Sequence, residues 1–586
     1  MSTNISKQKR EDLLAKIKEI RSFIVTAPQD ENTSNLLTYL SDIEKDLNGK
    51  KYGLVFEEHR EEIDEVLNSH TPVLTEDKDL FIDNGGQMNF IIEGDNLASL
   101  KLLEKTHKAK IDLIYIDPPY NTGKKDFIYD DVYVDKDDSY RHSKWISFMH
   151  SRLNMAKMLL SKRGVIFISI DDNELANLRL LCDSIFGEQN FVAILSVENN
   201  PKGRKNSNYV SVSNDYCLIY AKSINDGYFI ENIPKDIKDL AQDEDGNYVH
   251  NSGKRVLVGE NDFNDNVTDF SSDKHYTIYY NPEEKQIVIH KETDVKETDV
   301  DLLSRGYIRY FSYNENGFVY NTYTEQKIKE LFSVGALDFK NGKIYEKNFS
   351  TCIRIKSMVT NKKYKAVLNN AEVSYVLDVK TTSAKTDLKQ LFGINESPFS
   401  NPKNIGLIKL LISLIDRKDI SILDFFAGSG TTGHAIMKLN VEDGGNRHFI
   451  LCTNNENNIC RDITYERIKR VIDKEGYTAS LKYYKVDYVP ISDRLYYEYA
   501  DELLHHIREL VELENGVNFA GNVQIAIVLT EEEFAEFISQ LEENVDCRKV
   551  YLGHDILMDA QQAQILKDRK VAINIIPDYY YKELEG

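Results

Sequence analysis

A short segment that begins at Asp117 combines groups able to hold a planar amine. The segment is Asp117-Pro118-Pro119-Tyr120, and it directly follows the apolar run 111–116. Proline has a fixed φ and no N–H group, so the strand predicted over this run must end there. The Asp117 carboxylate and the Pro118 carbonyl can each accept a hydrogen bond from an exocyclic amine, and the Tyr120 ring can stack on a base. A simple surface turn is the alternative, and we favour the chemical interpretation.

A glycine-rich turn occurs much further along the chain. The strand-like run 420–426 is followed by Gly428-Ser-Gly-Thr-Thr-Gly433. Glycines allow positive φ and close approach to a ligand, and the start of the next helix presents free N–H groups. This combination indicates a nucleoside cofactor. The spacing, with Glu456 further on, also matches the dinucleotide fingerprint weakly, whereas a Walker A loop is excluded because no Gly-Lys-Ser/Thr follows.

Short apolar strands alternate with helices around both motifs. Strands are predicted at 89–93, 111–116, 164–170, 420–426 and 448–453, and helices at 96–105, 145–160, 405–415, 433–439 and 463–471. This alternation predicts an α/β fold with a doubly wound, mostly parallel sheet. Ligands of such sheets bind at the carboxyl ends of the strands, so both motifs should lie at that edge.

The alternation also predicts the domain organisation. Residues 201–400 are rich in Tyr, Asn, Asp and Lys and interrupt the pattern, which indicates an insertion into one α/β domain. We predict a helical region at 1–80, a first half of the domain at 81–200, the insert at 201–400, a second half at 401–490, and a small acidic α/β domain at 491–586.

The net charge of −22 at first argues against a DNA partner, because phosphates repel a negative protein. The charge is unevenly spread, however. Residues 1–90 have 11 basic and 18 acidic side chains, and residues 491–586 have 8 and 20. Residues 341–390 have 10 basic and 4 acidic side chains, so this stretch is either a DNA contact or a solvated lysine-rich surface.

Several other classes are disfavoured by composition. The six cysteines are scattered without a C-x-x-C pair, which disfavours a disulfide framework and a structural zinc site. The 13 histidines show no ligand spacing, so no metal is predicted. No run approaches the length of a membrane span, and the N-terminus lacks the apolar core of a signal peptide. We therefore expect a cytoplasmic protein.

Together the two motifs resemble those of the DNA amino-methyltransferases that use S-adenosylmethionine. Asp-Pro-Pro-Tyr followed later by Asp424-x-Phe-x-Gly-Ser-Gly-Thr-Thr resembles the permuted β class, in which the catalytic motif precedes the cofactor motif. Residues 201–400 have the position of that class's target-recognition region. The segments 51–57, 449–459 and 481–486 are similar to the modification (Mod) subunits of type III restriction-modification systems.

The resemblance implies methylation at N6 of an adenine that is flipped out of double-stranded DNA. It implies a homodimer and a helicase-nuclease (Res) partner. The expected catalytic residues are Asp117, Pro118, Pro119 and Tyr120. The expected cofactor contacts are Asp95, Lys403, Phe426, Gly428, Ser429, Gly430, Thr431, Thr432 and Glu456. The expected DNA contacts are Lys202, Arg204, Arg354, Lys356, Lys362, Lys363 and Lys365.

Other interpretations stay open at this point. The chain could be a solitary DNA methyltransferase, a subunit that only recognises DNA, or, remotely, an NAD-dependent enzyme. Cytosine-N4 methylation is disfavoured, because that chemistry more often has Ser in place of Asp117. Phe426 could be core packing, Lys403 a solvated lysine, and Trp145 is expected to pack in the core. Deletion of 491–586 is expected to spare cofactor binding and weaken assembly.

Overall fold

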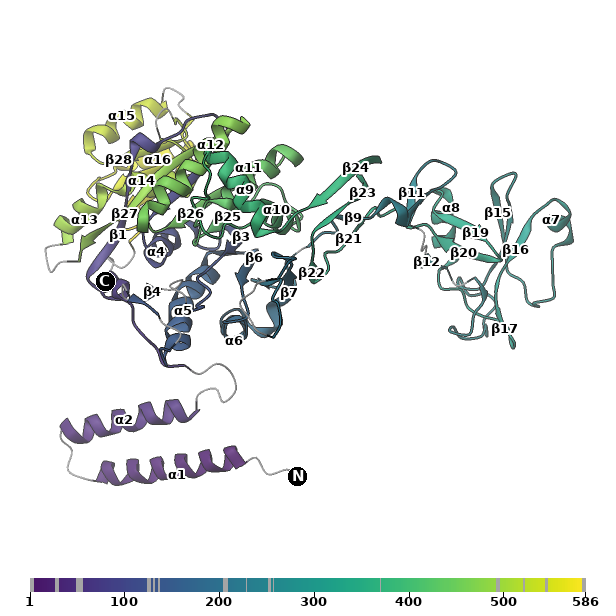
Figure 1. The fold of residues 1–586 in the computed structure, drawn as a ribbon, viewed down its shortest axis with the longest axis horizontal. Coiled ribbons are helices and arrows are strands. Elements are labelled where there is room, and N and C mark those ends of the chain that lie inside the picture. Colours follow the sequence, from purple (N-terminus) through teal and green to yellow (C-terminus); the bar gives the residue numbers. More distant parts are fainter. Residues whose placement is uncertain are drawn as a thin grey trace.

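A computed structural model gives the fold of the chain (Figure 1). It describes residues 5–26, 31–48, 56–123, 128–129, 132–134, 137–203, 209–227, 229–250, 254–256, 258–368, 370–491, 496–519, 522–542 and 546–581. Among the helices of these stretches, none is long and apolar enough to cross a membrane.

A ten-stranded sheet forms the centre of the molecule. Its order is β1 (His70–Glu76), β27 (Ala479–Pro490), β2 (Gln87–Glu93), β26 (His448–Thr453), β25 (Ser421–Asp424), β3 (Ile111–Ile116), β6 (Leu160–Ile170), β8 (Asp215–Ala221), β7 (Phe191–Val197) and β22 (Met358–Val359). The strands from β27 to β6 are mutually parallel, whereas β1 and β8 are antiparallel to their neighbours. The predicted doubly wound, mostly parallel sheet is confirmed.

Helices cover both faces of this sheet, which explains why its strands are apolar on both sides. One face packs against α4 (Asn96–His107), α5 (Arg141–Leu159) and α6 (Leu175–Phe186). The other packs against α10 (Ile405–Ser413), α11 (Thr431–Asp443) and α12 (Glu466–Glu475). The helix α9 (Thr381–Phe392) lies against α12, and the short hairpin β4 (Ile128–Tyr129) and β5 (Val132–Tyr133) follows β3.

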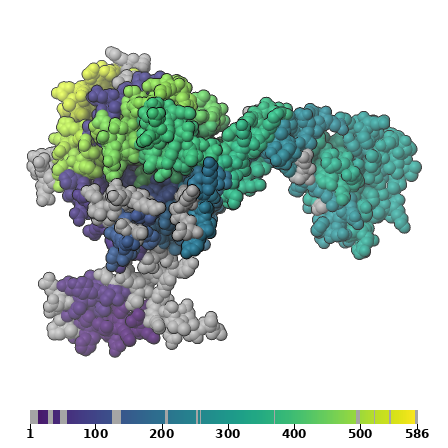
Figure 2. All heavy atoms as spheres, viewed as in Figure 1, coloured from purple at the N-terminus to yellow at the C-terminus, as the bar shows by residue number. Residues whose placement is uncertain are grey.

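The insert leaves the sheet later than the sequence predicts. Strand β8 pairs with β6 and β7, so the sheet continues past the predicted boundary at residue 200 to Ala221, and β22 returns before residue 400. The boundary was misplaced because β7 and β8 form an antiparallel pair, and the described residues between them contain no helix of the kind that marks βαβ units. A stem of β9 (Ile233–Pro234), β21 (Cys352–Ile353), β23 (Lys362–Leu368) and β24 (Ala371–Leu377) then carries a distal lobe (Figures 1 and 2).

The distal lobe has a small core of its own, built from residues such as Ile278, Ile328 and Ile344. Its helices are α7 (Val300–Ser304) and α8 (Glu325–Ser333). Its strands, with those next to the stem, are β10 (Leu240–Gln242), β11 (Tyr248–His250), β12 (Lys254–Arg255), β13 (Gly259–Glu260), β14 (Thr277–Asn281), β15 (Gln286–His290), β16 (Ile308–Tyr310), β17 (Ser312–Asn314), β18 (Gly317–Phe318), β19 (Leu337–Lys340) and β20 (Lys343–Glu346).

The N-terminal region is only partly helical. Helices α1 (Ile5–Thr26) and α2 (Glu31–Asn48) form a hairpin that lies apart from the sheet in Figure 1, and α3 (Glu62–Ser69) follows. The segment then enters the sheet as β1, inside the predicted helical region 1–80. Strand β1 pairs antiparallel with β27, which lies more than 400 residues later in the chain.

The C-terminal segment contains a small parallel sheet and also belongs to the central core. The sheet is β28 (Ile525–Val528), β29 (Lys549–Gly553) and β30 (Ala572–Ile576), with helices α15 (Glu531–Glu542) and α16 (Ala560–Asp568). Before it, α13 (Tyr496–Leu504) and α14 (Ile507–Asn515) bury Leu510 and Val511 in the core of the main domain. Glu512 is fully buried there and pairs with Lys482 of β27 at 2.6 Å.

Candidate functional site

Two aspartates lie at the ends of neighbouring parallel strands. Asp424 ends β25 and Asp117 follows β3, and the two strands pair through Leu113 and Ile422. The next strands lie on opposite sides of this pair, β6 beside β3 and β26 beside β25. Residues 111–120 and 420–428 therefore meet at the topological switch point, where open α/β sheets bind their ligands.

The Asp117 side chain is partly buried beside a lysine. The Lys403 ammonium lies 3.1 Å from Asp117 Oδ1 and donates a hydrogen bond to the Tyr120 hydroxyl. Burial raises the pKa of Asp117, and the Lys403 charge opposes that rise. Burial also raises the pKa of Tyr120 well above its usual value, so its ring stays neutral. Lys403 thus lies at the Asp117 turn and not among the residues that line the neighbouring cavity.

The turn after β3 is held from behind by two buried groups. The Trp145 indole is fully buried and donates a hydrogen bond of 2.7 Å to the Pro119 carbonyl. Asn121 has a φ of +56°, a left-handed conformation that favours Asn, and its amide donates to Glu174 at 2.5 Å. Trp145 is therefore a core residue, as the sequence indicates, and it also positions the turn.

Glu174 is a supporting residue that the sequence analysis did not identify. Its fully buried carboxylate accepts hydrogen bonds from Asn121, from His142 at 2.7 Å and from Asn177 at 2.7 Å. The available signal was its place, four residues after β6 at the same edge of the sheet. A buried carboxylate with three partners fixes the backbone next to Tyr120.

A cavity of roughly 550 Å³ joins the two motifs. Among the expected site residues, it is lined by Asp95, Asp117, Pro119, Phe426, Gly428 and Glu456. The lining includes five carboxyl side chains and one guanidinium. Phe426 lies beside Phe148, with ring centroids 5.8 Å apart. Such a cavity suits a flat aromatic ring joined to a positive charge and disfavours an anionic pyrophosphate.

The single guanidinium belongs to Arg152, which the sequence analysis also missed. It is fully buried and forms a two-pronged ion pair with Glu61, at 2.6 and 3.1 Å. It also reaches Asp95 at 3.5 Å and donates to the Asn96 amide oxygen. Burial raises the pKa of Glu61 despite Arg152. The Asp95 carboxylate also accepts hydrogen bonds from backbone N–H groups at the start of α4, and these bonds hold it in the wall of the cavity.

The glycine turn reaches the cavity with its backbone. Gly428 and Gly430 have φ values of +49° and +70°, and Gly430 is the N-cap of α11. A β-carbon at Gly428 would lie 3.3 Å from the Phe399 ring. A side chain at this position would therefore be strained and would crowd its surroundings.

The hydroxyls of the same turn face inward and do not line the cavity. Arg467, which is buried, donates to Ser429 Oγ at 3.2 Å and to Thr431 Oγ1 at 2.7 Å. Thr432 donates to Asp424, whose pKa is raised to about 7 by burial. The structure thus gives Ser429, Thr431 and Thr432 the role of building the turn.

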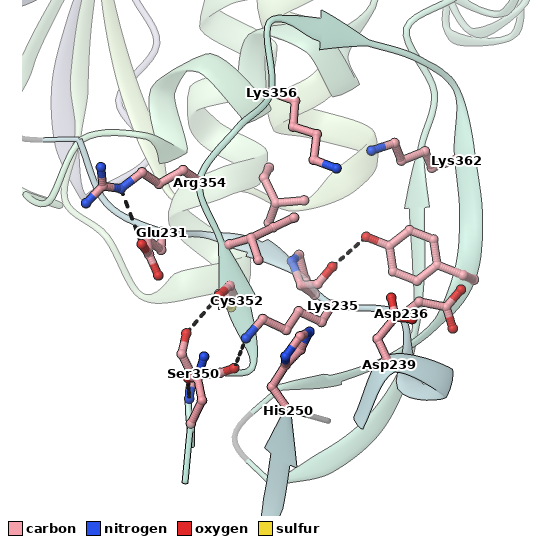
Figure 3. A pocket seen from close by; sticks show the side chains of 15 residues that line it. Glu231, Lys235, Asp236, Asp239, His250, Ser350, Cys352, Arg354, Lys356 and Lys362 are labelled. Carbon is pink, nitrogen blue, oxygen red and sulfur yellow. Dashed lines mark hydrogen bonds and ion pairs between the residues drawn. The ribbon is translucent and has the colours of Figure 1, made fainter. Parts of the chain in front are cut away.

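The basic residues expected to contact DNA are divided between two faces of the stem. Arg354, Lys356 and Lys362 line a second cavity of roughly 780 Å³ together with acidic side chains (Figure 3). Lys363 and Lys365 lie on the opposite face of β23 from Lys362. Both are exposed, and neither lines this cavity. Arg354 pairs with Glu231 at 3.3 Å. Lys202 is exposed, and Arg204 lies outside the described residues.

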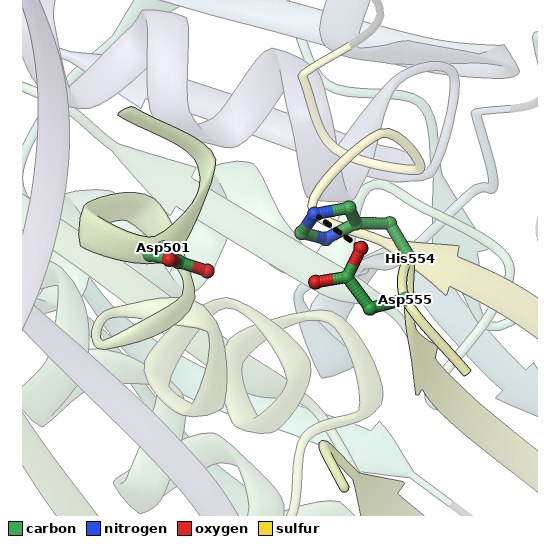
Figure 4. A group of neighbouring side chains, drawn as sticks. All are labelled: Asp501, His554 and Asp555. Atoms are coloured by element: carbon green, nitrogen blue, oxygen red, sulfur yellow. Dashed lines mark ion pairs between the residues drawn. The ribbon is translucent and has the colours of Figure 1, made fainter. Parts of the chain in front are cut away.

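One group of potential metal ligands occurs in the C-terminal segment. Oxygen and nitrogen atoms of Asp501, His554 and Asp555 lie within 4.8 Å of one another (Figure 4). His554 and Asp555 form an ion pair of 3.3 Å. The two carboxylates are exposed, and exposed acidic groups are common without an ion, so this group carries no assignment.

Comparison with known proteins identifies the family. A family model for DNA methylases of the N6/N4 type matches residues 111–466. The EcoPI Mod subunit of Escherichia phage P1 is 33% identical over 402 residues, which cover 64% of this chain and 58% of that protein. The StyLTI Mod subunit of Salmonella typhimurium is 33% identical, with 67% and 58% covered.

A third relative is covered more fully. The type II methyltransferase M.KpnI of Klebsiella pneumoniae is 34% identical over 366 residues, 62% of this chain and 79% of that protein. The chain spans a little over half the length of the two Mod subunits. The family match covers both halves of the site and the insert between them, and the chain belongs to the N6/N4 DNA methylase family.

Proposed function

We propose that this chain transfers a methyl group from S-adenosylmethionine to N6 of adenine in double-stranded DNA. The observation that carries the proposal is the single cavity between the Asp117 turn and the Gly428 turn. In this cavity the Asp117 carboxylate, which can accept a hydrogen bond from an amino group, lies near Phe426, whose ring can contact an adenosine. Family membership supports the same reaction class.

The lining of the cavity fits S-adenosylmethionine, the cofactor of this family. The cofactor supplies an electrophilic methyl group on a positively charged sulfonium. Phe426 can contact its adenine, and Glu456 can accept from ribose hydroxyls. The acidic lining suits the positive charge, whereas NAD would bring two phosphates against the same carboxylates. The cavity therefore favours S-adenosylmethionine over the remote NAD interpretation.

The residues around Asp117 can then activate the amine. The N6 lone pair of adenine is delocalised into the ring and is a poor nucleophile. Hydrogen bonds from the N6 hydrogens to the Asp117 carboxylate and the Pro118 carbonyl would localise that pair while Tyr120 stacks on the base. The bond from N6 to the methyl carbon forms as the carbon–sulfur bond breaks, and N6 loses one proton. The raised pKa of Asp117 suits it to accept that proton.

Asp117 also supports adenine over cytosine as the substrate base. Enzymes of this family that act on cytosine N4 more often carry Ser at this position. The flipped base would enter at the carboxyl edge of the sheet, at a cost of a few kcal/mol for unstacking. In this proposal the insert contacts the DNA through Lys362, Lys363 and Lys365, Lys202 contacts it from the segment between β7 and β8, and the enzyme works in the cytoplasm.

We further propose that the chain is the modification subunit of a type III restriction-modification system. The similarity to the EcoPI and StyLTI Mod subunits supports this role. The expected partners are a Res subunit and a second copy of the chain. A second candidate is a methyltransferase without such a partner, because the chain covers 79% of the type II enzyme M.KpnI.

The main test measures transfer of labelled methyl groups to unmodified DNA, followed by sequencing that detects modified bases. The wild-type chain should produce N6-methyladenine, and Asp117→Ala should abolish transfer while calorimetry still detects S-adenosylmethionine binding. Asp83→Ala, at an exposed aspartate, is the matched control. Wild-type transfer by Asp117→Ala, or modified cytosine instead of adenine, would overturn the proposal.

The proposed DNA contacts have a separate test. Charge reversal at Lys362, Lys363 and Lys365 should weaken DNA binding and reduce its dependence on salt, because fewer counterions are released. Unchanged affinity and an unchanged salt slope would show that these lysines are only a solvated surface.

A further inference from the structure

The helical hairpin α1–α2 has too small a core for an isolated unit. Ile17 and Ile24 of α1 are buried, and the described side chains of α2 are at most half-buried. Short helices owe most of their stability to the packing of an apolar face. In Figures 1 and 2 the hairpin lies apart from the sheet and the C-terminal segment. Its stability therefore calls for a further packing partner.

Apolar side chains remain exposed on both helices of this hairpin. On α1 they include Leu13, Ile20 and Phe23, and on α2 they are Leu36, Tyr39 and Ile43. The exposed fractions range from 46% at Leu13 and Leu36 to 77% at Phe23. We call these six residues the hairpin face. Val25, near the end of α1, is also exposed but lies about 80–100° to the other side of the buried Ile17 and Ile24.

The six residues lie on one side of the hairpin. With about 100° of rotation per residue, Leu13 and Ile20 lie about 20–60° to one side of the buried Ile17 and Ile24. Leu36 and Ile43 are displaced by about 40–60° in the same sense from the half-buried Leu40. Because the two helices run antiparallel (Figure 1), displacements of the same sense bring both stripes to the same face.

The charges of the two helices are complementary. The sequence of α1 has six basic and three acidic residues, and the sequence of α2 has four acidic and one basic. Within the hairpin they already form an ion pair, Arg21 with Glu44 at 3.0 Å. A second hairpin that places its α1 over this α2 repeats the pairing of opposite charges on both sides of the interface.

We propose that the hairpin face is the dimer interface of this protein, occupied by the same face of a second copy. A two-fold axis parallel to the helices places α1 of each chain over α2 of the other, in a four-helix bundle. A two-fold axis across the helices would instead stack α1 on α1 and α2 on α2, with like charges opposed. Charge thus selects the first arrangement.

The arrangement specifies which residues meet. Arg21 contacts Ser41 and Glu44, so Ile20 and Ile43 lie at the same height along the hairpin. An axis parallel to the helices preserves that height. Ile20 of one chain therefore faces Ile43 of the other, whereas the two copies of Ile20 lie on the diagonal of the bundle.

The first test is the mass of the full-length protein by sedimentation at micromolar concentration. The wild-type chain should be a dimer, and Ile20→Glu with Ile43→Glu should raise the dissociation constant by on the order of 100-fold or more, because each charge would be buried in the bundle. Ala15→Glu places the same charge on the opposite side of α1 and should leave the dimer intact. A monomeric wild-type chain, or a dimer that survives the double substitution, would overturn the proposal.

The second test is covalent and reports the geometry. Chains carrying Ile20→Cys and Ile43→Cys, co-expressed with different tags and oxidised, should form a mixed disulfide dimer, which neither variant forms alone. A crosslink between two copies of Ile20→Cys would show the opposite arrangement and contradict the charge argument. The interface rests on the proposed homodimer and not on methylation, because a dimer that fails to methylate DNA leaves the interface intact.

Discussion

Glu174 is the group whose removal most directly tests how the turn after Asp117 is held in place. It does not line the cofactor cavity, and it reaches the turn only through Asn121. We predict that Glu174→Gln and Glu174→Ala lower kcat for DNA methylation and leave the affinity for S-adenosylmethionine within about twofold.

The magnitudes come from the three hydrogen bonds that the carboxylate accepts. Glutamine keeps the shape and one acceptor oxygen, so the bonds from Asn121 and His142 to Oε1 survive without the assistance of charge. The difference between a charged and a neutral hydrogen bond is about 1 kcal/mol, or roughly fivefold in kcat if it is expressed in the position of the turn. Alanine leaves the Asn121 amide buried without this acceptor, which costs about 1–3 kcal/mol, and kcat should fall up to about 100-fold.

The assay is a steady-state measurement of methyl transfer with DNA and cofactor varied separately, beside calorimetry and thermal unfolding. Asp172→Asn removes the charge of an exposed neighbour of Glu174 and should behave as wild type. A wild-type kcat in Glu174→Ala would refute the positioning role. Equal losses of kcat and cofactor affinity, with a lower Tm, would show that Glu174 only stabilises the fold.

Three further predictions concern charge and the C-terminal segment. Because burial raises the pKa of Asp117 and Lys403 opposes it, kcat/KM should fall on acidification above the usual range of aspartate, and Lys403→Met should move that acidic limb to higher pH; a shift to lower pH would contradict the assignment. Arg152→Met leaves Glu61 without its cation and should lower the free energy of unfolding by about 3–5 kcal/mol in a urea titration, and an unchanged midpoint would show that the pair is not stabilising. Contrary to the expectation from sequence, deletion of 491–586 removes α14 from the core and should abolish cofactor binding, so a folded fragment that binds S-adenosylmethionine would refute the shared core.

Five of the six mutually parallel strands, β2, β3, β6, β25 and β26, could be predicted from sequence because each contains a short apolar run and is followed by a helix further along the chain. The sixth, β27, was not predicted, because its sequence carries charged residues and has no such pattern. The pattern fails where that coupling is absent. Strand β8 pairs antiparallel with β7, and the part of the connection that the structure describes contains no helix to mark a βαβ unit. Strand β1 pairs with a strand at the far end of the domain. Local patterns carry no information on pairings of this kind.

The two motifs could be found from local spacing, but their supports could not. Asp117 and Gly428 stand in short segments whose residue types suggest their chemistry. Arg152 and Glu174 are charged residues that are completely buried. From sequence alone, a charged residue within or next to a predicted helix is expected to be exposed to solvent, so neither position could be recognised. Their roles depend on partners distant in the chain, such as Glu61, 91 residues before Arg152.

The sequence could not predict that the three hydroxyl groups of the glycine turn are buried and do not face the cavity. Ser429, Thr431 and Thr432 occur in the expected motif, yet their side chains are bound by Arg467 and Asp424. The turn needs these partners because two of its glycines adopt left-handed conformations and the helix start leaves backbone groups to be satisfied.

The uneven charge of the chain has a different meaning once the contacts are known. Residues 491–586 carry a large acidic excess, with 20 acidic and 8 basic side chains. Two of those acids are buried against basic residues of the main domain, Glu512 with Lys482 and Glu514 with Lys110 at 3.0 Å. Part of the acidity is therefore internal and binds the C-terminal segment to β27 and the end of α4. A partner that binds this segment through charge must therefore contact its exposed carboxylates, such as those in the first turn of α15, and not the buried Glu512 and Glu514.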